Sequence, residues 1–67
     1  MNANLLRSKI AERGMTQGML AKAIGVSQNT LSKKMIGRRD FTAGEILKIC
    51  EALNIVSDDM KCEIFLS

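Results

Sequence analysis

Glycine placement is the feature that most restricts how this 67-residue chain folds. Gly14, Gly25 and Gly37 each follow a short segment whose apolar residues recur three to four positions apart. Helices often end at a glycine in the left-handed conformation, so each of the three predicts a helix end. Asn54 can serve the same purpose after a fourth such segment. The spacing therefore predicts a series of short helices.

Residues of the types that commonly begin helices precede each of these predicted helical segments. A Ser, Thr or Asn side chain can accept a hydrogen bond from a free amide in the first helical turn, and such caps are available at Asn2 or Asn4, Thr16, Ser27 and Ser57. The strongest start signal is the T-x-x-E capping box of Thr42 and Glu45. Phe41 and Ile46 stand at the two positions of a hydrophobic staple. We predict five helices, near residues 3–13, 17–24, 28–36, 43–53 and 58–65.

The composition agrees with a small helical protein. Proline is absent, and the apolar residues are mainly Leu, Ile, Met and Ala, which favour helices over strands. We predict one all-α domain over residues 1–67, with a core formed by the apolar stripes of the helices: Ala3, Leu6, Ile10, Leu20, Ala21, Ile24, Leu31, Met35, Ile46, Ile49, Cys50, Leu53, Met60, Ile64 and Phe65. No apolar run approaches the roughly 20 residues that span a bilayer, and we expect a cytoplasmic protein.

The charges are separated along the chain. Six basic residues and no acidic residue lie between Arg13 and Arg39, whereas six acidic residues and only two lysines follow from Asp40 onward. Solvated surface charge is one explanation of such a block. A face of a single sign also attracts a polyanion, and this favours a nucleic-acid partner.

The segment from Gln17 to Ile36 has the layout of a helix-turn-helix. Two short predicted helices are joined by Gly25-Val26-Ser27, and Ala21 is small where the two helices would cross. Val26 and Leu31 are expected to point into the core and fix the angle of the second helix. The first turn of that helix then projects from the body, which suits insertion into the major groove.

These residues resemble the Cro/CI-type helix-turn-helix of phage repressors and XRE-family regulators. The resemblance covers residues 5 to 66 and is carried by Thr16-Gln17, Leu20-Ala21, Ile24-Gly25-Val26-Ser27, Thr30-Leu31-Ser32-Lys33-Lys34, Gly37-Arg38-Arg39, Phe41-Thr42, Glu45-Ile46 and Glu63-Ile64-Phe65-Leu66. Small phage or prophage members from Gram-positive bacteria look most similar. The resemblance implies a compact five-helix, lambda-repressor-like fold and a transcriptional regulator, such as a repressor.

The chain departs from that family at four positions. The buried Arg–Glu ion pair that the family often has is replaced by apolar Ile10 and Met35. The Asn that often precedes the glycine after the second helix of the motif is Ile36. Gly18 lies inside the predicted helix 17–24, where it costs roughly 1 kcal/mol relative to Ala.

The predicted base-reading residues lie on helix 28–36. Gln28 and Asn29 carry amides that can pair with N6 and N7 of adenine. Thr30 can contact a thymine methyl group or a phosphate, and Lys33, one turn beyond Asn29, can reach guanine O6 and N7.

A second set is predicted to bind phosphates. Lys34, Arg38 and Arg39 supply charge without sequence information. The family resemblance places Gln17 beside a phosphate at a helix N-terminus. Ser27 is a further candidate, although its simplest role is a helix cap.

The expected partner is double-stranded DNA with an inverted-repeat operator, bound by a homodimer, because one recognition helix reads only a few base pairs. The terminal segment Ile64, Phe65 and Leu66 either contributes to the dimer interface or closes the core of the monomer. We expect the protein to act at the nucleoid.

Three alternatives remain from the sequence. A protein-interaction module, such as an antirepressor or antitoxin, would share this fold and charge pattern. An enzyme is disfavoured because the chain has no His, no paired acids on one helix face and no Gly-rich phosphate loop. Short helices broken by glycines disfavour a membrane-surface helix. With two cysteines and no histidine, we expect neither a metal site nor a cofactor.

Overall fold

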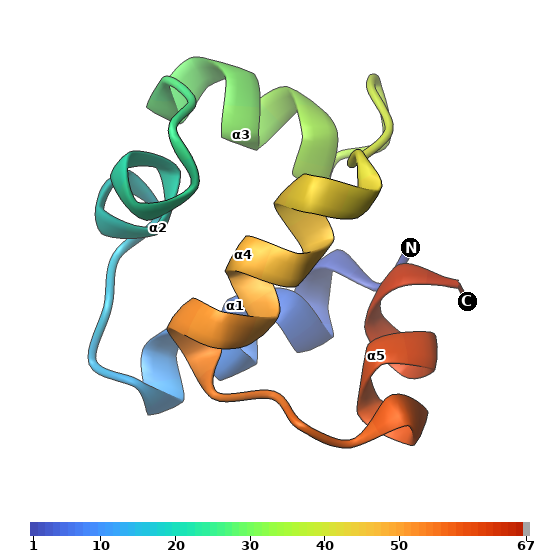
Figure 1. Ribbon diagram of the computed structural model, residues 1–67. Coiled ribbons are helices and arrows are strands. Elements are labelled where there is room, and N and C mark those ends of the chain that lie inside the picture. Colours follow the sequence, from blue (N-terminus) through green and yellow to red (C-terminus); the bar gives the residue numbers. More distant parts are fainter. Residues whose placement is uncertain (67) are drawn as a thin grey trace.

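The computed structural model describes residues 1–66 and is all-helical over that range (Figure 1). The helices are α1 (Ala3–Glu12), α2 (Gln17–Ile24), α3 (Gln28–Met35), α4 (Ala43–Leu53) and α5 (Asp58–Phe65). All five predicted helices are confirmed, and only α1 and α3 differ from their predicted ranges, each ending one residue earlier.

Every helix begins at a side chain that the sequence marked as a cap. Asn2, rather than Asn4, caps α1 by accepting from the Leu5 amide at 3.1 Å. The capping box of α4 is complete, since the Glu45 amide donates to Thr42 Oγ1 at 3.1 Å and the Thr42 amide donates to Glu45 Oε1 at 2.9 Å. These bonds satisfy amides that the helix itself leaves without an acceptor. The other caps are Thr16, Ser27 and Ser57.

The ends of α1 to α4 share one geometry. A residue with positive φ follows each helix, directly after α2 and α4 (Gly25 and Asn54) and one residue later after α1 and α3 (Gly14 and Gly37), with φ between 55° at Asn54 and 87° at Gly37. The next amide then donates back to a carbonyl inside the helix, as in a Schellman motif. At α3 this donor is Arg38, which bonds the Lys33 carbonyl at 2.9 Å, so Ile36 does not disturb the turn. At the other three helices the donor is apolar and packs on the core: Met15, Val26 and Ile55.

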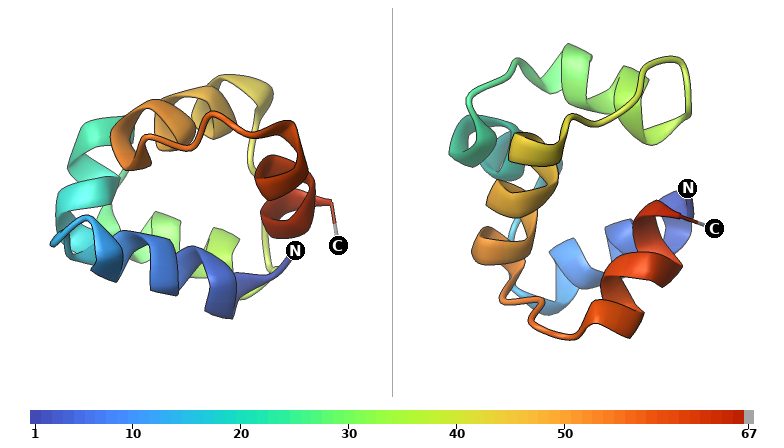
Figure 2. Two further views of the ribbon diagram at one scale, coloured as in Figure 1. Left: turned by 90° about the horizontal axis from the view of Figure 1, so that it is seen from below. Right: turned by 45° about the vertical axis from the view of Figure 1, so that its right-hand side comes forward.

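The core lies between the helices, which surround it in both views of Figure 2. The helix α2 packs on α3 and α4, while α1 packs on α2 and α5. The chain ends meet, because the Asn2 amide donates to the Ile64 carbonyl at 2.8 Å. Both Ile10 and Met35, which replace the ion pair of the family, belong to the buried cluster. The other buried apolar residues are Leu6, Leu20, Ala21, Ile24, Leu31, Ile49, Cys50, Leu53, Ile55 and Ile64.

The terminal segment helps to close the core of the monomer, and the expectation that it forms a dimer interface is wrong for Ile64; for Phe65 and Leu66 it stays a prediction. Ile64 is completely buried. Phe65 is half-buried, with its ring edge-on to Phe41 at 5.8 Å between centroids. Leu66 alone of the three is exposed. Within residues 1–66, no helix combines the length and apolar character needed to cross a membrane.

Candidate nucleic-acid interface

One face of α3 is anchored in the core and the opposite face is open. Leu31 is fully buried and Met35 nearly so, and both belong to the core cluster. Gln28, Asn29 and Lys33 are exposed on the other side of the helix. Figure 1 shows α3 along the upper edge of the molecule, with α2 to one side. The arrangement presents the polar side of a short helix to solvent.

The first turn of α3 is organised by Ser27. Its Oγ accepts from the Thr30 amide at 3.1 Å and donates to Thr30 Oγ1 at 2.9 Å. The Ser27 hydroxyl is thus engaged with both the amide and the hydroxyl of Thr30, which supports its role as the cap of α3. A phosphate contact from Ser27 stays a prediction.

Gln17 opens α2, and its side chain turns toward α3. Its Nε2 donates to the sulfur of Met35 at 3.1 Å, and the side chain is half-buried. The apolar replacement at Met35 thus supplies a soft acceptor that joins the two helices of the motif. No pattern in the sequence predicted this contact. The first-turn amides of α2 lack helical acceptors, so a phosphate contact at this helix end stays a prediction.

Lys34 was predicted to bind phosphate, and its surroundings contradict that prediction. It is only 8% exposed, and its Nζ lies 2.6 Å from Glu45 Oε1. The hydrogen bond from Lys34, followed by that from the Thr42 amide, holds the pKa of the Glu45 carboxyl below its usual range. The Lys34 ammonium also lies 6.0 Å from the centre of the Phe41 ring. Lys34 therefore ties the end of α3 to the start of α4 and is not a free surface cation.

The exposed cations of this face lie in the last turn of α3 and in the segment that follows it. Lys33, Arg38 and Arg39 are all exposed. Among residues 1–66, ion pairs join Lys9 to Glu12, Lys34 to Glu45 and Lys61 to Asp58, and none of the three exposed cations takes part in them. Arg38 stands at the Schellman position that is apolar after α1, α2 and α4, and it extends into solvent instead of packing inward.

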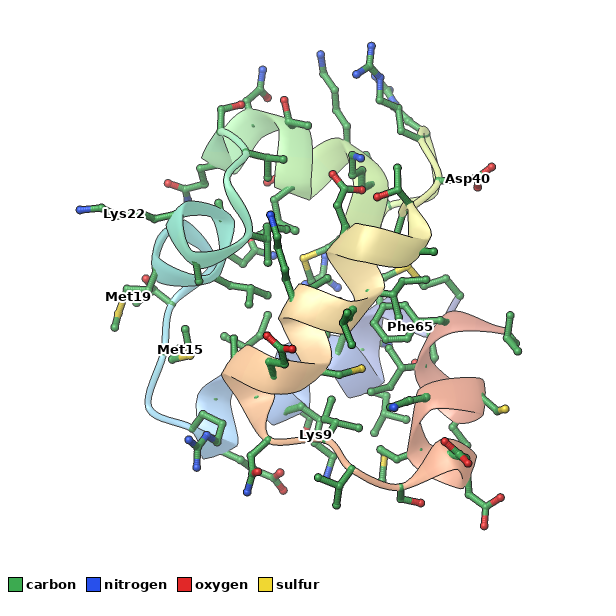
Figure 3. The ribbon with its side chains drawn as sticks, in the orientation of Figure 1. Lys9, Met15, Met19, Lys22, Asp40 and Phe65 are labelled. Carbon is green, nitrogen blue, oxygen red and sulfur yellow. The ribbon has the colours of Figure 1, made fainter. Side chains whose placement is uncertain are left out.

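The neighbouring charges complete the electrostatic picture. Figure 3 shows Lys22 pointing outward from α2, and Asp40 pointing outward from the segment that follows α3. Asp40 is the first acidic residue after Glu12 in the chain. The α3 face and the turn before it thus carry positive charge without an acidic residue. Such a face attracts an anionic partner.

Two thiols lie away from this face, in α4 and α5. Cys50 is buried, and this burial raises the pKa of its thiol, whereas Cys62 is exposed. Within the described residues, no three side chains of the His, Cys, Asp or Glu type come together as metal ligands.

Comparison with known proteins gives one finding of similarity. A family model described as helix-turn-helix (HTH_3) matches residues 6–59, which span α1 to α4 and the first residues of α5. No curated protein matches the chain. No solved structure matches it either.

Proposed function

The chain belongs to the helix-turn-helix family of DNA-binding domains, and on this premise we propose that it is a phage or prophage transcriptional repressor. It binds a specific operator in duplex DNA by placing α3 in the major groove. The observation that carries the proposal is the exposed face of α3, with two neutral amides at its start and unpaired cations at its end.

The base-reading set consists of residues on the exposed side of α3. The amides of Gln28 and Asn29 pair with adenine, where one side chain can contact both N6 and N7. Thr30 contacts a thymine methyl group or a phosphate, and Lys33 reaches guanine or a phosphate. The geometry supports these roles because Gln28, Asn29 and Lys33 are solvent-exposed while α3 is fixed from beneath by Leu31.

The phosphate-binding set is smaller than the sequence suggested. It contains Arg38 and Arg39, together with the first-turn amides of α2 at Gln17. Arginines after α3 and a helix N-terminus at α2 lie at opposite ends of the motif, so they can contact the backbone on both sides of one groove. These contacts fix position and supply salt-dependent affinity.

Two copies are proposed to bind one operator, since a two-fold pair places two recognition helices about 34 Å apart, one turn of duplex. The interface that we propose is the apolar surface of Leu47 and Val56, which are 57% and 83% exposed. A groove beside them is also lined by Glu51 and Lys61. Opposite charges on one patch can pair with each other across a two-fold axis, which favours a second copy as the occupant.

The proposal is tested by selecting bound duplexes from a random library and measuring the affinity of the selected site at several salt concentrations. We expect an inverted repeat, strong salt dependence and two chains per duplex by light scattering. Val56→Glu should reduce the complex to one chain, and the matched change Leu66→Glu should not. Failure to enrich any sequence, with no salt-dependent duplex binding, would favour the protein-interaction alternative, an antirepressor or antitoxin.

A further inference from the structure

Two glycines occupy the same position in two different helices. Gly18 is the second residue of α2, and Gly44 is the second residue of α4. Neither has a positive φ, so the backbone requires glycine at neither site. Alanine would favour both helices. Backbone conformation does not explain why α2 has a glycine at this place.

The surroundings of the two glycines differ. A Cβ at Gly44 would meet open space, whereas a Cβ at Gly18 would lie 3.2 Å from Oε1 of Gln28 and 3.7 Å from its Cδ. The Gln28 carboxamide therefore lies directly against the backbone of the first turn of α2. At 3.2 Å the added carbon would be closer than an ordinary van der Waals contact, so the Gln28 side chain would have to shift.

This contact restrains a side chain that is otherwise exposed. Gln28 stands at the first position of α3, where nothing on its own helix limits its rotamers beyond the local backbone. Its Oε1 lies beside Gly18 in the first turn of α2, where the helix dipole is positive. A side chain held before it meets DNA loses less rotamer entropy on binding than a free one.

We infer that Gly18 is a specificity-determining position, because its missing side chain lets α2 hold Gln28 in the conformation that reads a base. Gly18 touches no DNA in this arrangement and acts through Gln28. The inference deepens the proposed function and rests on the reading role assigned there to Gln28. It also gives a physical reason for the one helix-weakening residue in the motif.

The test compares Gly18→Ala with Gly44→Ala, the same change at the same helical position. Both variants should keep the fold, and Gly44→Ala should raise the Tm by a few degrees because alanine favours the helix. Affinities are measured for the selected operator and for duplexes changed at the base pair that Gln28→Ala relaxes. Gly18→Ala should lower discrimination at that base pair by about threefold to tenfold, part of the value of a bidentate contact. Gly44→Ala should leave it unchanged.

The double variant Gly18→Ala/Gln28→Ala separates a positioning role from a structural one. With Gln28 gone, we expect Gly18→Ala to have no further effect on DNA discrimination and to raise the Tm as Gly44→Ala does. Equal discrimination for Gly18→Ala and wild type would overturn the inference while leaving the proposed function intact. An equal loss of discrimination from Gly18→Ala in the presence and in the absence of the Gln28 side chain would also overturn the inference. If Gln28→Ala itself keeps full discrimination, the reading role fails first, and the inference fails with it.

Discussion

The two ends of α3 are held by different neighbours and through different interactions. At the start, the neutral carboxamide of Gln28 rests against α2 at Gly18. At the end, Lys34 is bound by the Glu45 carboxylate at the start of α4. The exposed residues follow the same division, with amides on the first turn and cations on the last turn and beyond. The motif can thus separate base reading on α3 from phosphate binding in the segment that follows α3.

The middle of α3 makes that division possible. Leu31 and Met35 fix the helix on the core, while each end keeps its own neighbour. Changes beneath the helix should therefore disturb both kinds of DNA contact, whereas changes at one end should disturb one kind. We expect the largest effects from changes in the middle of α3 and smaller effects from changes at its α4 end.

The largest effect is expected from charging the core beneath α3. Ile10→Arg or Met35→Glu alone should lower the free energy of unfolding by roughly 3 kcal/mol or more, since each buries a charge without a partner. The double variant restores the ion pair common in the family and should recover part of the loss. Denaturant unfolding of the four proteins gives the coupling energy. Simple additivity of the two single losses would mean that the side chains do not meet.

A smaller effect is expected at the α4 end. Glu45→Gln keeps the shape of the side chain but removes the charge that pairs with buried Lys34, and should cost about 1–2 kcal/mol of unfolding free energy. Glu51→Gln is the matched control, because it makes the same change of net charge at an exposed position on the same helix. Hydrogen exchange should show faster opening of the Arg38 amide than of the Thr30 amide in Glu45→Gln. Equal acceleration at both amides would contradict separate anchoring of the two ends.

The smallest effect is the pH dependence of the same contact. The Lys34 and Thr42 hydrogen bonds lower the pKa of folded Glu45, so the unfolded state binds more protons as the solution is acidified. The stabilisation is fully present above the ordinary glutamate pKa of about 4.3 and is lost as the pH falls through the lower folded pKa. The stability difference between wild type and Glu45→Gln should therefore shrink in acid. A stability difference that stays constant from neutral pH into acid would contradict the assignment of this pH dependence to Glu45.

The sequence was sufficient for the helices because their limits are local. Caps such as Thr42 and turn residues such as Gly37 act within a few positions, and they were located to within one residue. The apolar stripes likewise predicted every member of the buried cluster except Ile55, which lies in the turn after α4. Lys34 was misassigned although it lies three positions after buried Leu31, on the inward side of α3. Only the placement of α4 shows that the Glu45 carboxylate lies beside Lys34 and pairs with it.

Other features depend on contacts between distant segments. Ile64 and Phe65 are apolar, and periodicity alone does not distinguish an interface with a second copy from the core of the monomer. The contact between Gly18 and Gln28 joins two helices across the turn, and the acceptor that Met35 offers to Gln17 joins them again. Each needs the angle between α2 and α3, which is set by tertiary packing rather than by local sequence.

The central claim, that α3 reads bases and that the segment after it holds phosphates, is tested most directly by binding titrations over a range of salt. Gln28→Ala and Asn29→Ala are compared with Arg38→Ala and Arg39→Ala on operator and scrambled duplexes. The two amide variants should lose about 1–3 kcal/mol on the operator and far less on scrambled DNA, with an unchanged salt slope. The two arginine variants should weaken both duplexes by similar factors and reduce the slope by up to about one unit per phosphate contact in each half-site. Equal losses on the two duplexes for Gln28→Ala and Asn29→Ala would contradict the claim, because α3 would then not be the element that reads the sequence.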